Sequence, residues 1–477
     1  MYRTTAMRTF CVLQCAIGLW FARVQPVAGS EGAPTFLWAA QAGGADYEAG
    51  YSIAVDHDGN AIVAGAFSGT VACGETSLTS KGDRDIFFLK LDPAGKVIWA
   101  RQAGGPGFDE ALSVAVDVRG NVYMTGSFSG VAKFGDTELT SRGGQDVFLA
   151  KYDRDGKLVW AQRAGGTTDD RGTGVAADTS GNVYLTGVFT GAADLGGANA
   201  ISRGGKDVFT IKFDPQGNLV WLRTDGGAAD DFSKGIAVDA SGYVFVTGGY
   251  QGVASFGIKT LYSRGGTDMF LLHYDNSGEF VWVKDAGSTG GEDYGNAVAV
   301  DGAGCSYVTG AFSGRAVFDA DKYFLSEGRR DIFVVKFDPQ GVILWARKAG
   351  GPLDDEGCAL ALDAESNVYV TGHFKGKASF DKTNLESSGT PYQDKDVFAL
   401  KLDRDGKILW ARRAGGSGTD YGFGIAVGQE GHVYLTGSFT GTAAFDSTQL
   451  TSRGLNDAFI GKLDANVRDS NQKPTDR

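Results

Sequence analysis

The stretch Asp153–Gly166, DRDGKLVWAQRAGG, recurs in similar form along almost the whole chain of 477 residues. Its tryptophan sets the spacing of the copies. The motif tryptophans, which lie 61, 61, 61, 61, 63 and 65 residues apart, are Trp38, Trp99, Trp160, Trp221, Trp282, Trp345 and Trp410. A fixed period of this length is typical of repeat proteins, in which neighbouring units bury a common core. The sequence therefore predicts one repeat-built domain over residues 30–465.

The amino-terminal segment has the features of an export signal. Arg3 and Arg8 precede a mostly apolar stretch, Phe10–Ala22, and small residues follow at Val27–Gly29. An apolar stretch of this length is too short to span a bilayer comfortably, so we expect residues 1–29 to be removed as a signal peptide. The expected location is secreted, periplasmic or cell-surface, with no membrane-spanning segment left after removal. Lipidation of Cys15 is the less favoured alternative, and we expect residues 466–477 to form a disordered polar tail.

The composition is rich in glycine and acidic overall. Glycine supplies 73 residues and proline only 9, which indicates many turns in a chain that is neither collagen-like nor proline-rich. Hydrophobic residues make up 42%, which is enough for a sizeable core. The formal net charge of −12 argues against nucleic acid and anionic membranes as partners, because both are polyanions that attract Lys/Arg surfaces. Solubility is the simpler explanation of that charge.

Each repeat contains four stretches with β-strand character, and the second repeat illustrates them. The first stretch is short and small-sided, Ser113–Asp117, and the second, Asn121–Phe128, follows a Gly-Asn turn. The third is the Asp-x-Phe stretch Asp146–Asp153, and the fourth carries Trp160 after an Asp-x-x-Gly turn. Between the second and third stretches lies a looser section, which is either an extra hairpin or a long loop.

These features predict an all-β fold. After residue 30 no stretch shows sustained helical periodicity, while short alternating strands and Gly-rich turns recur. The Asp-x-Phe strand and the tryptophan strand each occur seven times, which predicts a seven-bladed β-propeller with four-stranded blades. No tryptophan strand follows the last Asp-x-Phe strand, Asp457–Asp464, and no partner strand precedes the first tryptophan strand, Thr35–Ala42. We therefore expect the N-terminal strand to complete the last blade and close the ring of a monomer.

Three kinds of repeated residue have predicted structural roles. The glycine of each Thr-Gly pair, such as Gly126, marks a bulge or a close approach of another backbone. The motif tryptophans are expected to pack blade against blade, with sugar stacking as the less favoured role. A lysine such as Lys151 lies five residues after six of the seven Asp-x-Phe aspartates, with His273 in its place in one repeat, and these lysines are expected to expose their charged ends.

The repeats resemble the SBBP family of bacterial β-propeller repeats, whose consensus is close to Gly-Asn-Val-Tyr-x-Thr-Gly-x-Phe, Asp-x-Phe-x-x-Lys and Gly-x-x-x-Trp. The resemblance covers about residues 35–464 and implies a seven-bladed propeller of an exported bacterial protein. It implies no catalytic residues and no cofactor. A fainter similarity to the repeats of quinone-cofactor dehydrogenases rests on Asp-x-x-Gly-x-x-x-Trp, but those repeats are shorter.

One acidic position is the candidate for a binding site. A carboxylate follows each motif tryptophan by ten residues, and these carboxylates are Glu48, Asp109, Asp170, Asp231, Glu292, Asp355 and Asp420. If the small first strand lines the axis, they approach one mouth of the central channel, where they would hold a divalent cation or a basic ligand. The favoured alternative is structural, because Asp accepts backbone N–H groups in turns and a need in every blade explains seven copies.

The remaining features leave two functions open. The connection Gly287–Gly291 and the loop Glu386–Lys395 depart from the repeat, and insertions of this kind lie in loops that often bind ligands. The histidines show neither zinc spacing nor a catalytic triad, and they are His57, His273, His373 and His432. We expect a non-catalytic scaffold for an unknown protein or glycan ligand. The alternative is an enzyme at one channel mouth, and a mixed, asymmetric cluster of His, Arg, Tyr and carboxylate there would favour it.

Overall fold

The computed structural model describes residues 34–319, 321–390 and 393–465, and the regular elements in these ranges are all β-strands. The predicted signal peptide, residues 1–29, and the predicted tail, residues 466–477, lie outside the described residues. Within them, there is no helix long and apolar enough to cross a membrane. The all-β prediction is confirmed.

The strands form antiparallel sets of four, each named here by its innermost strand. The β2 set contains β2 (Glu48–Val55), β3 (Ala61–Phe67), β6 (Asp85–Leu91) and β7 (Val97–Ala103). The β8 set contains β8 (Glu110–Val116), β9 (Val122–Phe134), β10 (Thr137–Tyr152) and β11 (Leu158–Gly166). The β12 set contains β12 (Arg171–Ala177), β13 (Val183–Asp194), β14 (Asn199–Phe213) and β15 (Leu219–Gly227). The β16 set contains β16 (Phe232–Val238), β17 (Val244–Phe256), β18 (Lys259–Tyr274) and β19 (Phe280–Ala286).

The next two sets follow the same order along the chain. The β20 set contains β20 (Tyr294–Val300), β21 (Ser306–Phe312), β24 (Asp331–Phe337) and β25 (Ile343–Ala349). The β26 set contains β26 (Glu356–Leu362), β27 (Val368–Lys375), β30 (Lys395–Leu402) and β31 (Ile408–Gly416).

The β32 set combines strands from the two ends of the described chain. It contains β32 (Tyr421–Val427), β33 (Val433–Phe439), β36 (Asp457–Asp464) and, as its outermost strand, β1 (Thr35–Gly44). The pairing of β1 with β36 runs from Thr35 opposite Asp464 to Ala42 opposite Ala458. The N-terminal strand therefore lies where the tryptophan strand lies in the other sets.

The looser section of each repeat is an extra hairpin, which decides between the two predicted alternatives. Four of these hairpins are separate: β4 (Thr70–Cys73) with β5 (Thr76–Thr79), β22 (Arg315–Asp319) with β23 (Lys322–Leu325), β28 (Lys377–Phe380) with β29 (Thr383–Glu386), and β34 (Thr442–Phe445) with β35 (Thr448–Thr451). In the β8, β12 and β16 sets the hairpin continues the second and third strands. Each hairpin pairs with the end of the outermost strand of the preceding set, as β4 does with β1 and β34 with β31, or with the glycine that follows that strand.

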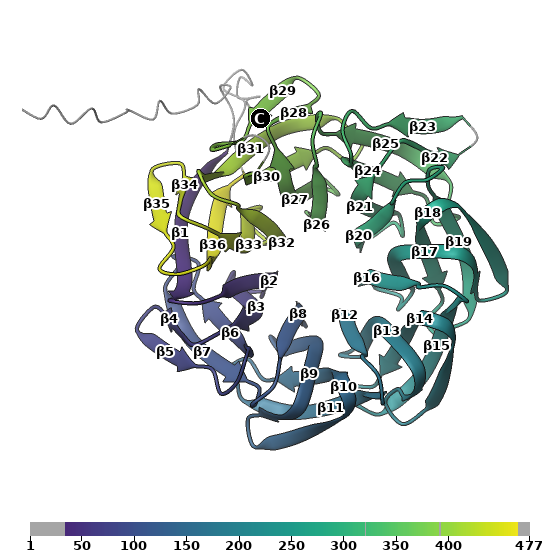
Figure 1. Ribbon diagram of the computed structural model, residues 1–477, viewed down its shortest axis with the longest axis horizontal. Helices are drawn as coiled ribbons and strands as arrows, with labels where there is room; N and C mark the ends of the chain where they lie inside the picture. Colours follow the sequence, from purple (N-terminus) through teal and green to yellow (C-terminus); the bar gives the residue numbers. More distant parts are fainter. Residues whose placement is uncertain (1–33, 320, 391–392, 466–477) are drawn as a thin grey trace, which may run out of the picture. The chain divides into compact units, whose positions relative to one another are not determined.

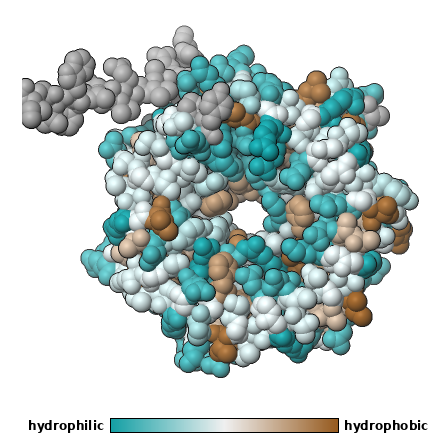
Figure 2. All heavy atoms as spheres, viewed as in Figure 1, coloured by the Kyte–Doolittle hydropathy of each residue, from teal (hydrophilic) through white to brown (hydrophobic). Residues whose placement is uncertain are grey.

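The innermost strands lie around a central opening. Figure 1 shows β2, β8, β12, β16, β20, β26 and β32 at the inner edge of their sets, and the opening is visible in the space-filling view of Figure 2. Each of these strands contacts the next along the chain, and β32 contacts β2. The same hydrogen bond joins neighbouring innermost strands in successive sets. The N–H of Val114 donates to Ser52 Oγ, and the N–H of Val175 donates to Ser113 Oγ, both at 3.1 Å.

The hydrophobic core lies between neighbouring sets. One cluster joins Phe88 of the β2 set to Phe148 of the β8 set, and another joins Phe87 of the β2 set to Ile460 on β36. All four side chains are at most 1% exposed. A propeller sheet is small and twisted, so it buries its apolar faces against its neighbours rather than within itself.

The motif tryptophans pack between sets, as predicted. The glycine of each Asp-x-x-Gly turn lies flat on the tryptophan of the preceding set, so that a Cβ on Gly406 would be 2.6 Å from Trp345. The indole N–H also bonds that turn: Trp345 Nε1 donates to the carbonyl of Arg404 at 3.0 Å. Trp38 on β1 makes the same contacts with Gly95 and with the Pro93 carbonyl of the β2 set.

The prediction that the repeated lysines expose their ends is wrong for most copies. Lys90, Lys151, Lys212 and Lys462 are only 6–8% exposed. Lys151 Nζ lies 5.1 Å above the ring of Tyr123 and donates to the Pro215 carbonyl of the next set at 3.2 Å. The aliphatic stem is buried because the tyrosine of the second strand and the neighbouring turn cover it.

Candidate binding site at the mouth of the central channel

Six of the seven candidate carboxylates are buried and accept backbone N–H groups. These six, which are 0% exposed, are Glu48, Asp109, Asp170, Asp231, Asp355 and Asp420. One oxygen of each accepts the N–H of the second glycine in the preceding Gly-Gly pair, at 2.6–2.8 Å. In the five aspartates the other oxygen accepts the N–H of the residue 20 positions later, at 3.0–3.3 Å. The geometry supports the structural alternative, because these contacts tie an outermost strand to the next set.

Glu292 does not occupy the equivalent place in the β20 set. Glu292 is exposed, whereas Asp293 is buried and accepts hydrogen bonds from the N–H and Oγ of Ser288 at 2.7 and 2.6 Å and from the N–H of Ser313 at 2.8 Å. The connection Gly287–Gly291 contains one residue more than its counterparts, so the carboxylate of the repeat is displaced by one position. Counting ten residues from Trp282 therefore selects the wrong acid.

A second buried carboxylate lies beside each of these acids. In the β20 and β26 sets the pair is Asp331 and Asp355, and a Cβ on Gly350 would lie 2.9 Å from Asp331 Cγ and 3.0 Å from Asp355 Oδ2. Burial raises the pKa of Asp355 to about 8 and that of Asp331 to about 6, and each backbone N–H bond opposes the shift. The described residues contain no group of three or more His, Cys, Asp or Glu placed to hold a metal ion.

These buried acids predict a stability that falls as the pH rises. Burial raises the pKa of Asp109, Asp231 and Asp420 to about 7, from an ordinary value of 3.8. The folded state then holds more protons than the unfolded state between about pH 4 and pH 8, so stability is highest at the acid end of this window and is lost as the pH rises through the folded pKa. We expect the urea midpoint to be higher at about pH 5 than at about pH 8.5.

A matched pair of variants tests the source of this pH dependence. Asp355→Asn removes one titrating group, so the difference between the two midpoints becomes smaller. Glu292→Gln removes an exposed carboxylate and leaves the difference unchanged. A wild-type midpoint that rises with pH over this range, or equal slopes in both variants, contradicts the prediction.

The innermost strands differ from one another at a β-bulge. The register of every innermost strand shifts at the same place. The bulged residues, three positions after the buried carboxylate, are Tyr51, Leu112, Thr173, Lys234, Asn296, Cys358 and Phe423. The residues one position after that carboxylate are Ala49, Glu110, Arg171, Phe232, Tyr294, Glu356 and Tyr421. A bulge re-aims side chains, and here it gathers non-equivalent residues at one mouth of the channel.

The Thr-Gly glycine makes room for this bulge, which confirms the predicted close approach of another backbone. A Cβ on Gly248 would lie 1.8 Å from the carbonyl oxygen of Phe232, and a Cβ on Gly372 would lie 1.9 Å from that of Glu356. The same approach recurs in every set, at 1.8–2.1 Å. The constant glycine therefore leaves room for the bulge, whose own residue differs from one set to the next.

One side of the mouth carries a mixed polar cluster. Arg330 donates to the Tyr294 hydroxyl at 2.5 Å and lies 3.9 Å from the Glu356 carboxylate. Lys395 Nζ donates to Nε2 of His373 at 2.9 Å, and that nitrogen is 3.9 Å from Glu356. We name Arg330, Tyr294, Glu356, Lys395 and His373 the mouth cluster. Two hydrogen bonds and two contacts with the Glu356 carboxylate hold it together.

Aromatic side chains continue around the mouth from this cluster. They form an aromatic row, defined as Tyr47, Tyr51, Phe423 and Tyr421, all of them partly exposed. The hydroxyls of Tyr47 and Tyr51 are 2.7 Å apart, the Tyr51 and Phe423 centroids 5.5 Å, and the nearly parallel Phe423 and Tyr421 centroids 5.4 Å. The row is a continuous apolar surface with hydroxyls along it.

Cations stand at both ends of the aromatic row. The guanidinium of Arg84 lies 3.9 Å from the Tyr47 centroid, and the ammonium of Lys395 lies 4.7 Å from the Tyr421 centroid. Lys234 lies 4.3 Å from the Tyr294 centroid, and Arg171 pairs with Glu110. The mouth thus presents several cations beside the carboxylates Glu110 and Glu356, in a chain whose formal net charge is −12.

The Cys358 and His373 pair lacks the protonation state of a nucleophilic dyad. Cys358 Sγ lies 3.7 Å from His373 Nδ1. Burial raises the pKa of the Cys358 thiol, and burial together with the charges of Lys395 and Arg330 holds the pKa of His373 well below its usual range. In the tautomer in which Nε2 accepts from Lys395, the neutral imidazole carries its proton on Nδ1, which then cannot take the thiol proton.

A pocket of about 400 Å³ adjoins the mouth cluster. Gly290, Gly291 and Glu292 line one side of it, and Arg330 and Asp354 line the other. The extended connection Gly287–Gly291, which departs from the repeat, therefore shapes this pocket. The second departure ends at the mouth as well, since Lys395 closes the loop Glu386–Lys395, of which residues 391 and 392 lie outside the described residues.

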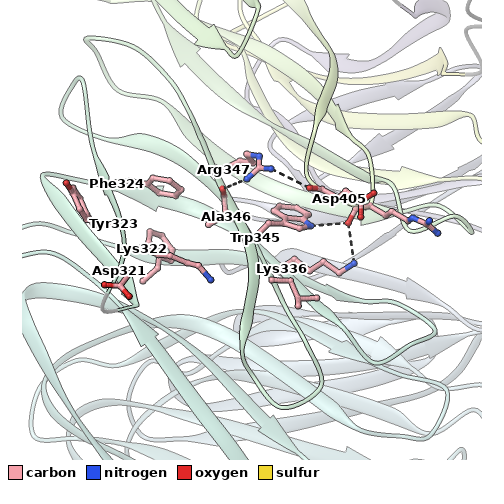
Figure 3. Close-up of a pocket in the computed structure, with 12 residues that line it drawn as sticks. Asp321, Lys322, Tyr323, Phe324, Lys336, Trp345, Ala346, Arg347 and Asp405 are labelled. Atoms are coloured by element: carbon pink, nitrogen blue, oxygen red, sulfur yellow. Dashed lines mark hydrogen bonds between the residues drawn. The ribbon is translucent and has the colours of Figure 1, made fainter.

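A larger cavity of about 760 Å³ lies on the outer side of the β20 set (Figure 3). Its polar groups already join the sets, since Trp345 Nε1 and Lys336 Nζ donate to the Arg404 carbonyl. Arg347 Nε also donates to the carbonyl of Gly406 at 2.7 Å. Arg223 Nε makes the same bond with Gly278 at 2.6 Å. This cavity is a widened form of the groove between sets, so it is a weaker site candidate than the mouth.

Sequence reasoning from constant positions missed the mouth residues. The motifs that recur in every repeat form the frame, and the mouth residues stand at positions that change from repeat to repeat. For the bulge residues among them, the signal is the variable residue three positions after a constant carboxylate, with small residues on either side.

The repeat geometry and the comparisons define this chain as a β-propeller protein. Residues 159–188 match the SBBP family, described as "Beta-propeller repeat", and the chain therefore carries the repeat that its motifs resemble. An uncharacterized WD repeat-containing protein of Acanthamoeba polyphaga mimivirus is 23% identical over 501 residues, which cover 84% of this chain and 36% of that protein. The regulatory protein FlaEY of Caulobacter vibrioides is 29% identical over 188 residues, which cover 36% of this chain and 19% of that protein. The chain thus spans about a third or less of these relatives.

Two solved structures illustrate the structural similarity. The WD40 β-propeller domain of Doa1 is 11% identical with a TM-score of 0.43, and the alignment covers 89% of this chain and 96% of that one. The quinohemoprotein alcohol dehydrogenase of Comamonas testosteroni is 12% identical with a TM-score of 0.40, covering 92% of this chain and 78% of that one.

Proposed function

We propose that this protein is an exported, non-catalytic, seven-bladed β-propeller that binds its ligand at the mouth of its central channel. The single observation that carries the proposal is the bulge position of the innermost strands, which gathers Tyr51, Lys234, Asn296, Cys358 and Phe423 at one mouth. If the bulge position were purely structural, the same kind of residue would serve in all the sets, whereas its residue differs from set to set. Export rests on the basic and apolar amino-terminal segment.

Three contacts support seven blades in a closed ring. β1 pairs with β36, Trp38 packs on the Gly95 turn of the β2 set, and β32 contacts β2. The bond from Trp38 Nε1 to the Pro93 carbonyl repeats the bond that joins consecutive sets elsewhere. A ring closed in this way needs no other subunit to cover an open edge, which supports a monomer.

A thermal-shift panel tests ligand binding at the mouth. The panel covers divalent cations, neutral and acidic glycans and small metabolites, and we expect at least one compound to raise the melting temperature of the wild type. The triple variant Lys234→Ala, Asn296→Ala, Phe423→Ala should lose that shift. The control variant Ile201→Ala, Ile258→Ala, at exposed positions of the outer hairpins, should keep it. No shift with any compound, or an equal shift in both variants, contradicts the proposal.

An enzyme at the same mouth is the second candidate, and the mixed cluster of Arg330, Tyr294, Glu356 and His373 favours it. Perturbed pKa values in a cleft are typical of catalytic sites, and burial lowers the pKa of both His373 and Lys395. The protonation of Cys358 and His373 argues for binding instead. Turnover of a compound found by the panel, lost in His373→Gln, would establish the enzyme.

A further inference from the structure

We infer that the mouth binds a carboxylate-bearing sugar chain, that is, an oligosaccharide of uronic acids. This inference rests on the proposed function and adds the chemical class of its ligand. Three features of the mouth carry it: the aromatic row, the cations at both of its ends, and the carboxylates beside those cations.

The aromatic row suits the rings of a sugar chain. A pyranose ring presents C–H groups on its faces and hydroxyls at its edge, so it packs face-on against an aromatic ring while its hydroxyls reach polar groups. The row offers successive rings, with Phe423 stacked on Tyr421 at a centroid distance of 5.4 Å and tilted against Tyr51 at 5.5 Å, and the hydroxyls of Tyr47 and Tyr51 are 2.7 Å apart. A row favours several linked sugars over a single one.

The cations at the ends of the row select a ligand with acidic groups on separate sugars. Arg84 stacks on Tyr47 and Phe108, which leaves the N–H groups at the edge of its guanidinium plane for a carboxylate. At the other end Lys395 and Arg330 converge beside Glu356. Among the residues that the structure describes, neither Arg84 nor Lys234 forms an ion pair with a carboxylate.

The carboxylates at the mouth distinguish a singly charged sugar acid from a doubly charged phosphate group. Glu356 and Asp354 flank Arg330 at 3.9 and 3.8 Å, and Glu110 pairs with Arg171. These acids would repel a dianion, whereas they accept hydrogen bonds from sugar hydroxyls. The pocket of about 400 Å³ beside Arg330, which Ser313 and Arg329 also line, offers room for a further sugar at this end.

Calorimetric titration of the whole exported chain tests the inference. The probes are tetramers of galacturonate, glucuronate and mannuronate, the methyl ester of the galacturonate tetramer, and dextran sulfate. We expect at least one uronate tetramer to bind, and its methyl ester to bind at least about tenfold more weakly, since each lost charge-assisted hydrogen bond costs about a factor of ten. Arg330→Gln and Phe423→Ala should each weaken binding at least about tenfold.

Matched controls separate binding from folding. Lys259→Gln and Tyr262→Ala remove a cation and an aromatic ring from the exposed hairpin of β18 and should bind as the wild type does. The melting temperature of each variant establishes that it is folded, and Arg330→Lys should recover part of the affinity lost in Arg330→Gln.

Several results would overturn the inference. They are no binding of any uronate tetramer, equal binding of the ester or of dextran sulfate, or wild-type affinity in folded Arg330→Gln and Phe423→Ala. If the thermal-shift panel still finds another ligand that depends on the mouth, only the ligand class proposed here fails. If no ligand depends on the mouth, the proposed function fails as well.

Discussion

Deleting residues 35–44 should lower the free energy of unfolding of the whole domain by more than about 5 kcal/mol. The deletion removes β1, which pairs with β36 over Thr35–Ala42, and with it Trp38, which packs on Gly95 and bonds the Pro93 carbonyl. Loss of a packed tryptophan alone costs about 3–5 kcal/mol. The open edge of β36 would also lose its backbone partners. Urea unfolding followed by tryptophan fluorescence measures the effect.

A circular permutant is the matched control for this deletion. In the permutant, residues 35–44 follow Ala465 through a short linker, so that the same strand reaches β36 from the other end of the chain. We expect the permutant to recover most of the lost stability, because the contacts are restored and only the connectivity differs. A truncated protein that unfolds at the wild-type urea concentration would disprove ring closure by β1.

The substitution Gly248→Ala should destabilise the protein by about 3 kcal/mol or more. The added Cβ would lie 1.8 Å from the Phe232 carbonyl oxygen and 2.8 Å from the Ser233 Cα, and both atoms belong to the backbone of the neighbouring strand. The clash is relieved only if β16 moves away from β17 at its bulge. Because the bulge aims Lys234 at the mouth, ligand affinity should fall together with stability.

Gly302→Ala is the control for this substitution. No atom lies within 4 Å of a Cβ placed on Gly302, and its φ is not in the left-handed region. We expect a change within about 0.5 kcal/mol. A similar loss in both variants would mean that glycine entropy, rather than the close approach at the bulge, determines the cost of Gly248→Ala.

Much of the fold could be predicted, because the same sequence pattern occurs in every repeat. The alternating strands, the Asp-x-x-Gly turns and the tryptophan period depend on contacts within a repeat or between neighbours at one constant offset, so Trp345 and Gly406 repeat what Trp38 and Gly95 do. The local pattern does not decide between an extra hairpin and a long loop, because the pairing of the hairpin with the outermost strand of the preceding set joins two repeats.

The candidate site was less predictable, because the constant positions of the repeat form the frame and the residues at the mouth vary from repeat to repeat. The repeated carboxylates drew attention because they are constant, yet six of them are buried on backbone N–H groups. Glu292 was selected by counting, while one extra residue in the Gly287–Gly291 connection gives its place to Asp293. The burial of the repeated lysines is likewise not visible in a local pattern, because the tyrosine and the turn that cover Lys151 come from a different strand and a different repeat.

The sequence by itself determined the class of this protein: an all-β repeat with a fixed tryptophan period, strong turn signals and an orphan strand at each end. Those features are local or periodic, so they are visible in the amino-acid sequence alone. Only the tertiary structure decided which residues meet at the mouth of the central opening. The mouth brings together residues as distant in sequence as Tyr51 and Phe423, and their proximity follows from a bulge in every innermost strand and from the contact of β32 with β2.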